Sequence, residues 1–267
     1  MSNVIAIVNQ KGGVAKNTTA NALGLGLARK GYKVLLIDLD PQGNLSMSLG
    51  VPFPDEEPAT IAALLLNQLQ NPNGCEIGQE YFKHRYGVDF IVGNDDLGNV
   101  DRMLPGWRQS EFTLDAVLAL IKDRYDYVLI DCMPSIGSLT ENAIVAADEV
   151  LVPSEPQFFS TKGIQSLFNE IGKIQKRNNP GLQVAGIVAT KVDLRTNVAR
   201  EFTAGLRTLF ADSVNIFETM IPLSTKLSEC STGENMYEYD KNGKGVAAYA
   251  RFVDEYLAQK GGRQDGE

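Results

Sequence analysis

A glycine-rich turn near the N-terminus constrains the fold more than any other feature of the chain. NVIAIVN (residues 3–9) is a short apolar run of strand type, and QKGGVAKNTT (10–19) follows it directly. The next residues have the composition of a helix and end in Lys30 and Gly31, as helices often do. A glycine loop between a strand and a helix directs backbone N–H groups at one point, which favours a bound anion. We therefore expect a phosphate-binding loop over residues 11–18.

The alternation of strand and helix continues along the chain. Further apolar runs of strand type are YKVLLIDLD, VDFIVG, YDYVLID, EVLVPS and LQVAGIVATKV. Helical stretches separate them near residues 110–124, 137–147, 160–177 and 196–210. Nearly continuous apolar strands with helices between them predict an α/β fold, with a predominantly parallel twisted sheet and helices on both faces.

The length and the breaks in this pattern predict the domain organisation. The chain has 267 residues, which fits a single domain over 1–260. Several prolines interrupt the alternation over about 51–86, where we expect a helical insertion and a loop. The polar residues 261–267 are expected to form a disordered tail.

Composition argues against several other classes of protein. No apolar run approaches the length of about 18 residues that a spanning helix needs, so a cytoplasmic protein is expected. Cys75, Cys132 and Cys230 are far apart and odd in number, which predicts neither a disulfide framework nor a CxxC metal site. His84 is the one histidine, so a multi-histidine metal site is excluded and a Ser-His-Asp triad has one possible centre. With a net charge of −8, any contact with nucleic acid must use a local basic patch.

Two residues of the glycine loop depart from the usual phosphate-loop pattern. That pattern has a glycine before its lysine and a Ser or Thr after it, whereas this chain has Ala15, Lys16 and Asn17. A methyl group at Ala15 crowds a phosphate and is tolerable only if the φ angle is negative. The amide oxygen of Asn17 can coordinate Mg²⁺ but is bulkier than a hydroxyl, and Thr18 is rotated about 100° around the helix. The two changes leave metal affinity and hydrolysis open.

Three aspartates follow buried apolar runs. Asp38 and Asp40 end one expected strand, and Asp131 ends another. In open α/β sheets the ligand lies outside the carboxyl ends of the strands, which is also where the glycine loop lies. A single aspartate at a strand end is often a helix cap, but three at the same edge favour a role in phosphate chemistry. Cys132, which follows Asp131, is interpreted as a small buried residue rather than a ligand.

The spacing K-G-G-x-x-K, formed by Lys11 and Lys16, resembles the deviant Walker A motif of the ParA/MinD family of dimeric ATPases. Further sequences resemble motifs of that family in the same order: VLLIDLDPQGNLSMSLG, YDYVLIDCMPSIGSLTENAI, IPLSTKLSECSTGENMYEYD and GKGVAAYARF. The resemblance covers residues 3 to about 258 and implies a P-loop NTPase fold. The chain resembles the ParA (Soj-like) partition branch more than MinD, because it has the sequence DPQGN and an acidic C-terminal helix. The chain begins at its first strand, so no N-terminal DNA-binding domain is expected.

The resemblance implies ATP and Mg²⁺ as ligands and slow ATP hydrolysis. It implies that Lys11 reaches a phosphate on a facing subunit, that Lys16 neutralises phosphate charge and that Asp40 positions the attacking water. The residues implied to act on Mg²⁺ are Asn17, Asp38 and Asp131. The residues implied to bind nucleotide are Lys11, Gly12, Gly13, Val14, Ala15, Lys16, Asn17 and Thr18, with Lys191 and Pro222 beside the base. TKVD differs from the guanine-reading motif N-K-x-D at its first position, which favours ATP over GTP.

The resemblance also implies partners. An ATP-bound homodimer would bind DNA without sequence preference and lie on the nucleoid, without attaching to a membrane, and a ParB-like protein would stimulate hydrolysis. The residues implied to face DNA are Arg195, Arg200 and Lys226. Two alternatives stay open at this point: a ParA-like ATPase that positions a protein complex, and a binding-only ATP switch that Asn17 weakens in hydrolysis. The sequence identifies neither the cargo nor the partner.

Overall fold

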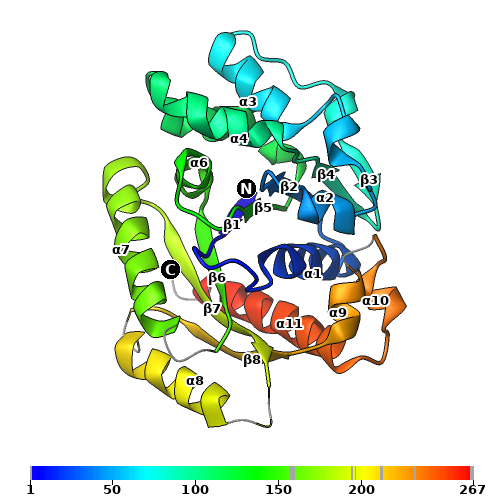
Figure 1. Cartoon of the computed structure of the whole chain (residues 1–267), viewed down its shortest axis with the longest axis vertical. Coiled ribbons are helices and arrows are strands. Elements are labelled where there is room, and N and C mark those ends of the chain that lie inside the picture. Colours follow the sequence, from blue (N-terminus) through cyan, green and yellow to red (C-terminus); the bar gives the residue numbers. More distant parts are fainter. Residues whose placement is uncertain are drawn as a thin grey trace.

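The computed structural model describes residues 2–156, 160–193, 195, 197–210, 213–230 and 233–264. Over these residues one sheet of eight strands runs through the molecule in the order β3-β4-β2-β5-β1-β6-β7-β8 (Figure 1). The strands are β1 (Asn3–Ile7), β2 (Val34–Leu39), β3 (Lys83–Arg85), β4 (Val88–Ile91), β5 (Tyr127–Cys132), β6 (Glu149–Ser154), β7 (Gln183–Val192) and β8 (Ile216–Pro222). Each neighbouring pair is parallel except β3 and β4, which are antiparallel. The predicted α/β fold with a predominantly parallel sheet is confirmed.

Helices cover both faces of the sheet (Figure 1). On one face lie α3 (Ile61–Gln70), α4 (Asp96–Met103), α5 (Thr113–Ala119), α6 (Ser138–Ala146), α7 (Ser160–Asn178) and α8 (Asn197–Phe210). On the other lie α1 (Lys16–Arg29), α2 (Asn44–Ser48), α9 (Thr225–Glu229), α10 (Met236–Tyr239) and α11 (Lys244–Gln264). Short 3₁₀ turns are η1 (Pro54–Glu56), η2 (Gln79–Tyr81), η3 (Leu104–Gly106), η4 (Ser110–Phe112) and η5 (Lys122–Arg124). Each layer buries its own apolar cluster against the sheet, which is why the strands are apolar on both faces.

Two glycines let α1 pack closely between the sheet and α11. A Cβ atom at Gly24 would lie 2.7 Å from a methyl group of Leu36 on β2, and one at Gly26 would lie 2.6 Å from a methyl group of Val253 on α11. Both distances are shorter than any real contact of a Cβ atom. The small residues therefore set the position of α1, and with it the position of the loop that precedes the helix.

The segment 51–86, where a helical insertion and a loop were expected, contains α3 together with η1, η2 and the edge strand β3. The helix α11 continues to Gln264, four residues into the predicted tail. Among the described helices, none combines the length and the apolar character needed to cross a membrane.

Candidate functional site

The glycine loop between β1 and α1 adopts a conformation that exposes backbone N–H groups. Gly13 and Ala15 both have positive φ angles, of 76° and 64°. Within the described residues, the N–H groups of Gly12, Gly13 and Ala15 donate to no other group. The side chain of Asn9 fixes the start of the loop, because it donates to Pro153 O (2.7 Å) and accepts the N–H of Lys11 (2.9 Å). The loop is therefore held in place while donors remain available for an anion.

The conformation of Ala15 corrects one expectation. A negative φ was the condition for alanine at this position, and the observed φ is 64°. A left-handed residue is needed here because the chain must turn from the loop into α1 while the N–H groups point to one side. Glycine adopts that conformation without strain, whereas an alanine side chain costs about 1–2 kcal/mol. The alanine thus stores strain in the loop.

A cavity of about 330 Å³ lies in front of the loop, at the carboxyl edge of the sheet. It is lined by Gly12, Gly13, Ala15, Lys16, Asn17, Asp40, Gln42, Asn44, Asp131 and Pro134. The three elements that supply its charged residues are α1, the turn after β2 and the end of β5. Because β2 and β5 pair in register, Asp38 lies opposite Asp131, and the strand-end carboxylates come together as the sequence predicted.

The charged groups of this cavity are largely withdrawn from water. Lys16 is only 8% exposed, and burial lowers the pKa of its ammonium group while Asp131 and Asp40 oppose that shift. Asp131 is 2% exposed, and burial together with the neighbouring Asp38 raises the pKa of its carboxyl group. In such surroundings charges interact more strongly than in water. A triphosphate would find one buried cation and the free donors of the loop at this point.

The residues present also fit a magnesium ion. The Oδ1 atom of Asp131 is buried and has no hydrogen-bond partner among the described residues. Buried polar atoms are rarely left in this state, and a carboxylate oxygen is a ligand that Mg²⁺ prefers. No group of three or more His, Cys, Asp or Glu side chains placed to hold a metal occurs in the described part of the chain. Mg²⁺ usually takes one or two protein ligands and completes its shell with phosphates and water.

Asn17 and Thr18 interact with each other at the start of α1. The Oδ1 atom of Asn17 accepts the backbone N–H of Thr18 (2.8 Å), and the Thr18 hydroxyl lies 3.4 Å from the same atom. Asn17 lines the cavity, whereas Thr18 does not. The Oδ1 atom of Asn17 can therefore coordinate a metal only if it shares or gives up its hydrogen bond with the N–H of Thr18.

Asp40 is fixed in the turn that follows β2. Its Oδ1 atom accepts the N–H of Gln42 (3.0 Å), and its backbone carbonyl accepts the N–H of Gly43 (3.0 Å). The side chain is 9% exposed and lines the cavity. The turn thus orients this carboxylate toward the space in front of the loop.

Asp38 has a different environment from the one that the sequence suggested. It is buried and is not among the residues that line the cavity. Its Oδ2 atom accepts both the N–H (2.8 Å) and the hydroxyl (2.7 Å) of Ser46, and its Oδ1 atom accepts the N–H of Asp40 (3.3 Å). Asp38 therefore anchors α2 beneath the site, and Ser46 is a supporting residue that no sequence signal had singled out.

The burial of Asp38 predicts a pH-dependent stability. Burial raises its pKa to about 7, although the hydrogen bonds from Ser46 act in the opposite direction. Because the folded pKa exceeds the unfolded value, the folded state holds a proton that the unfolded state releases between about pH 4 and 7. Stability from this group is thus present at acidic pH and is lost as the pH rises toward 7, by an amount on the order of 4 kcal/mol.

We expect Asp38→Asn to remove this pH dependence. We measure the free energy of unfolding of the variant and of the wild type by urea denaturation at pH 4.5 and at pH 8. The difference, variant minus wild type, should be more positive at pH 8 than at pH 4.5. Changes in packing act equally at the two pH values, so the double difference reports the ionisation of Asp38 together with its effect on the neighbouring Asp131. An unchanged pH profile would show that this carboxyl group titrates normally.

The remaining predicted nucleotide residues lie around the cavity rather than in its wall. The Nζ atom of Lys11 is 3.5 Å from Glu155 Oε2, and the side chain is 43% exposed at the mouth of the loop. Lys191 and Pro222 lie together at the ends of β7 and β8, because Val192 pairs with Pro222 and accepts the N–H of Leu223 (3.1 Å). The structure thus groups Lys191 with Pro222, and neither residue lines the cavity in front of the loop.

The residues predicted to face DNA are largely engaged with aspartates. Arg195 forms an ion pair with Asp193 (2.8 Å), and Lys226 forms one with Asp240 (3.0 Å). Both cations are more than half exposed. The side chain of Arg200 lies outside the described residues. A basic stripe made of these residues would carry less net charge than their sequence positions suggested.

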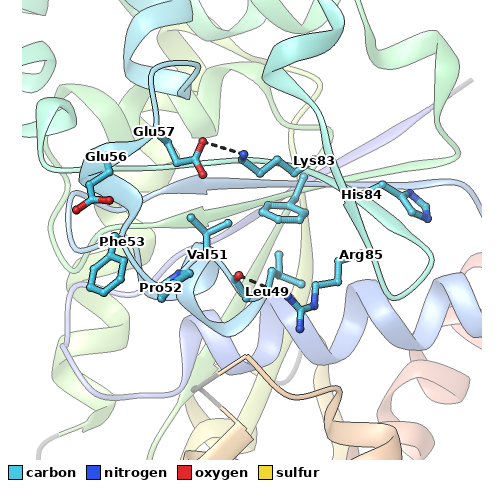
Figure 2. Close-up of a pocket in the computed structure, with 11 residues that line it drawn as sticks. Leu49, Val51, Pro52, Phe53, Glu56, Glu57, Lys83, His84 and Arg85 are labelled. Atoms are coloured by element: carbon cyan, nitrogen blue, oxygen red, sulfur yellow. Dashed lines mark hydrogen bonds and ion pairs between the residues drawn. The ribbon is translucent and has the colours of Figure 1, made fainter.

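A second cavity, of about 470 Å³, lies beside the edge strand β3 (Figure 2). Lys83 forms an ion pair with Glu57 (2.8 Å) there, and Arg85 donates to Gly50 O (3.4 Å). His84 contacts Asp89 (2.8 Å), and no Ser, Thr or Cys is among the described residues that line this cavity. The site therefore lacks the nucleophile that a triad around His84 would need.

The parallel sheet, the glycine loop before α1, the buried lysine and the strand-end carboxylates define a P-loop nucleotide-binding protein. A family described as an AAA domain matches residues 2–184. The chain is 36% identical over 264 residues to the chromosome-partitioning ATPase Soj of Treponema pallidum, covering 98% of this chain and 100% of that protein. It is 35% identical to the chromosome partitioning protein ParA of Caulobacter vibrioides over 98% of this chain and 96% of the other. The chain belongs to the ParA/Soj/MinD family of ATPases.

Solved structures agree with this assignment. The structure of cobyrinic acid a,c-diamide synthase from Mycobacterium smegmatis, with bound ADP and magnesium, has a TM-score of 0.80 and 31% identity, covering 95% of this chain and 93% of that one. An ATP complex of McdA from Cyanothece has a TM-score of 0.79 and 24% identity over 96% of both chains, which shows the shared fold.

Proposed function

We propose that this protein is a partition ATPase that binds and slowly hydrolyses ATP in the cavity in front of the glycine loop. The observation that carries the proposal is the meeting of buried Lys16, free loop N–H groups and the unpaired Oδ1 atom of Asp131 in one cavity. Phosphoryl transfer depends on positioning and charge neutralisation, and these groups supply both. The names of the Soj and ParA relatives and the ADP and magnesium in the M. smegmatis structure support this choice.

The loop and the charged residues of the site then have separate roles. The loop N–H groups and Lys16 bind and neutralise the phosphates, and Asp40 orients the attacking water and accepts its proton. Asp131 and Asn17 would hold Mg²⁺, which neutralises phosphate charge when it is bound. Asp38 anchors α2 through Ser46 and accepts the N–H of Asp40, which holds the backbone of Asp40 in the turn after β2.

The proposal includes an ATP-dependent dimer. Lys11 is partly exposed at the mouth of the loop, where it can leave Glu155 and reach a nucleotide bound by a second copy of the chain. In this state the dimer would bind DNA without sequence preference, and a ParB-like partner would stimulate hydrolysis. We place the protein in the cytoplasm, on the nucleoid when ATP is bound.

Phosphate release under single-turnover conditions tests the enzymatic part. ATP binding followed by Mg²⁺-dependent release of phosphate would support the ATPase. The second candidate is a binding-only switch, which the hydrogen bond between Asn17 and Thr18 favours because it competes with a metal for Oδ1. Binding without release would support that candidate, and a failure to bind ATP would contradict both.

A second prediction concerns DNA. We expect Arg195→Ala combined with Lys226→Ala to weaken DNA binding by the ATP-bound protein about tenfold and to lower its salt dependence, because two phosphate contacts are lost. Fluorescence anisotropy with duplexes of two unrelated sequences, at several salt concentrations, measures both effects.

The matched control removes two other ion-paired cations. Lys173 and Arg177 lie on α7 and pair with Glu170 and Glu141. Lys173→Ala combined with Arg177→Ala changes the net charge by the same amount, so equal losses in both double variants would indicate a general charge effect. Unchanged DNA binding in the first variant would show that another surface is used.

A further inference from the structure

We propose that Thr190 is a positioning residue that holds the phosphate loop in the conformation that accepts an anion. The inference deepens the proposed function and rests on it in one respect, namely that the anion is the phosphate of a nucleotide. Thr190 is the first residue of TKVD, in which the sequence pointed to Lys191 beside the base and gave Thr190 itself no role.

The contact between Thr190 and the loop is buried and spans much of the chain. Thr190 is 0% exposed near the end of β7, and its hydroxyl donates to Val14 O at 2.9 Å. The two residues are 176 positions apart. The strand β7 is separated from β1 by β6, so this bond ties the loop to a strand that is not its own (Figure 1).

The bond determines where the next N–H group points. The carbonyl of Val14 and the N–H of Ala15 belong to one trans peptide unit, in which they point in opposite directions. Since the carbonyl is held toward β7, the Ala15 N–H must point away from that strand. Ala15 lines the cavity, and its N–H has no partner within the described residues. Thr190 therefore aims a free donor away from β7, on the side where an anion would bind.

The strained alanine explains why such a bond is needed. Ala15 has a φ of 64°, a backbone conformation that is unfavourable for any residue with a Cβ atom. Rotation of the peptide unit between Val14 and Ala15 by about half a turn would bring φ into the negative range that alanine prefers. The same rotation would reverse the N–H and remove the donor. The hydroxyl of Thr190 opposes this rotation because it binds the carbonyl in the unrotated state.

The test compares Thr190→Val with two other variants. Valine keeps the shape and removes the hydroxyl, and we expect the dissociation constants for ATP and ADP to rise about tenfold by calorimetry, as for the loss of a hydrogen bond to a charged group. Thr190→Ser keeps the hydroxyl and should bind as the wild type does. In Ala15→Gly combined with Thr190→Val, most of the affinity should return, because glycine adopts the positive φ without strain.

A control separates positioning from stability. Thr113 is also buried, and its hydroxyl donates to Ser110 O at 2.8 Å, on the η4–α5 segment. Thr113→Val should lose comparable thermal stability and keep full affinity for ATP. Equal affinity losses in both valine variants, or none in Thr190→Val, would overturn the proposal.

A measurement without nucleotide distinguishes this inference from the proposed function. The three-bond coupling between the amide and α protons of Ala15, measured by NMR in the free protein together with the intraresidue amide–α proton NOE, distinguishes a positive from a negative φ. It should indicate a positive φ in the wild type and in Thr190→Ser, and a negative φ in Thr190→Val. An unchanged coupling in Thr190→Val would overturn the role of Thr190, whereas a wild type that keeps the coupling but fails to bind ATP would contradict the proposed function alone.

Discussion

Replacing Lys16 by alanine is expected to weaken ATP binding at least about a hundredfold, because charge-assisted hydrogen bonds to phosphate are among the strongest polar contacts in proteins. Lys16 is 8% exposed and shares its cavity with Asp40 and Asp131. Its removal leaves two carboxylates facing the phosphates with no cation between them, so repulsion adds to the lost attraction. Calorimetric titration with ATP measures the effect.

Two further variants make this result specific. Lys16→Gln keeps a long polar side chain but no charge, and it should bind nearly as poorly as Lys16→Ala if charge is what matters. Lys30→Ala removes an exposed cation beyond the other end of α1, where Lys30 pairs with Asp254, and it should bind ATP normally. Retention of micromolar affinity by both Lys16 variants would show that the loop does not bind the phosphates.

The sequence predicted the fold well where strands are buried on both faces. β1, β2, β4, β5, β6 and β7 lie in nearly continuous apolar runs, so they stand out from their surroundings. The two unpredicted strands lie at the edges of the sheet. β3 has the sequence KHR, in which two of the three residues are exposed, and β8 mixes polar and apolar residues and buries only Phe217 and Ile221. Edge strands carry little periodic signal, and that is why they were missed.

For the site, the sequence placed Lys16, Asp40 and Asp131 at one edge of the sheet but did not indicate how each side chain is held. Lys16, Asp40 and Asp131 come together because the topology of a parallel sheet brings strand ends to one edge. The positive φ of Ala15 and the partners of Asp38 depend on contacts between distant segments. Thr190 is the extreme case, since it acts through a single bond to a carbonyl 176 residues away. Such contacts leave no pattern in the sequence that reasoning about local motifs could detect.

Asp40→Asn should separate binding from hydrolysis. Asparagine keeps the size of the side chain and can still accept the N–H of Gln42, so the turn after β2 should stay intact. It cannot accept a proton from the attacking water, and loss of a positioned base lowers the rate of the chemical step about 100-fold or more. ATP affinity should stay equal or improve, because a negative charge no longer faces the phosphates.

Single-turnover phosphate release and calorimetry, applied to the same preparation, measure the rate of hydrolysis and the affinity for ATP separately. A variant that hydrolyses ATP at the rate of the wild type would show that another group orients the water. Gln42 and Asn44, which follow β2 and also line the cavity, are the polar side chains to test next.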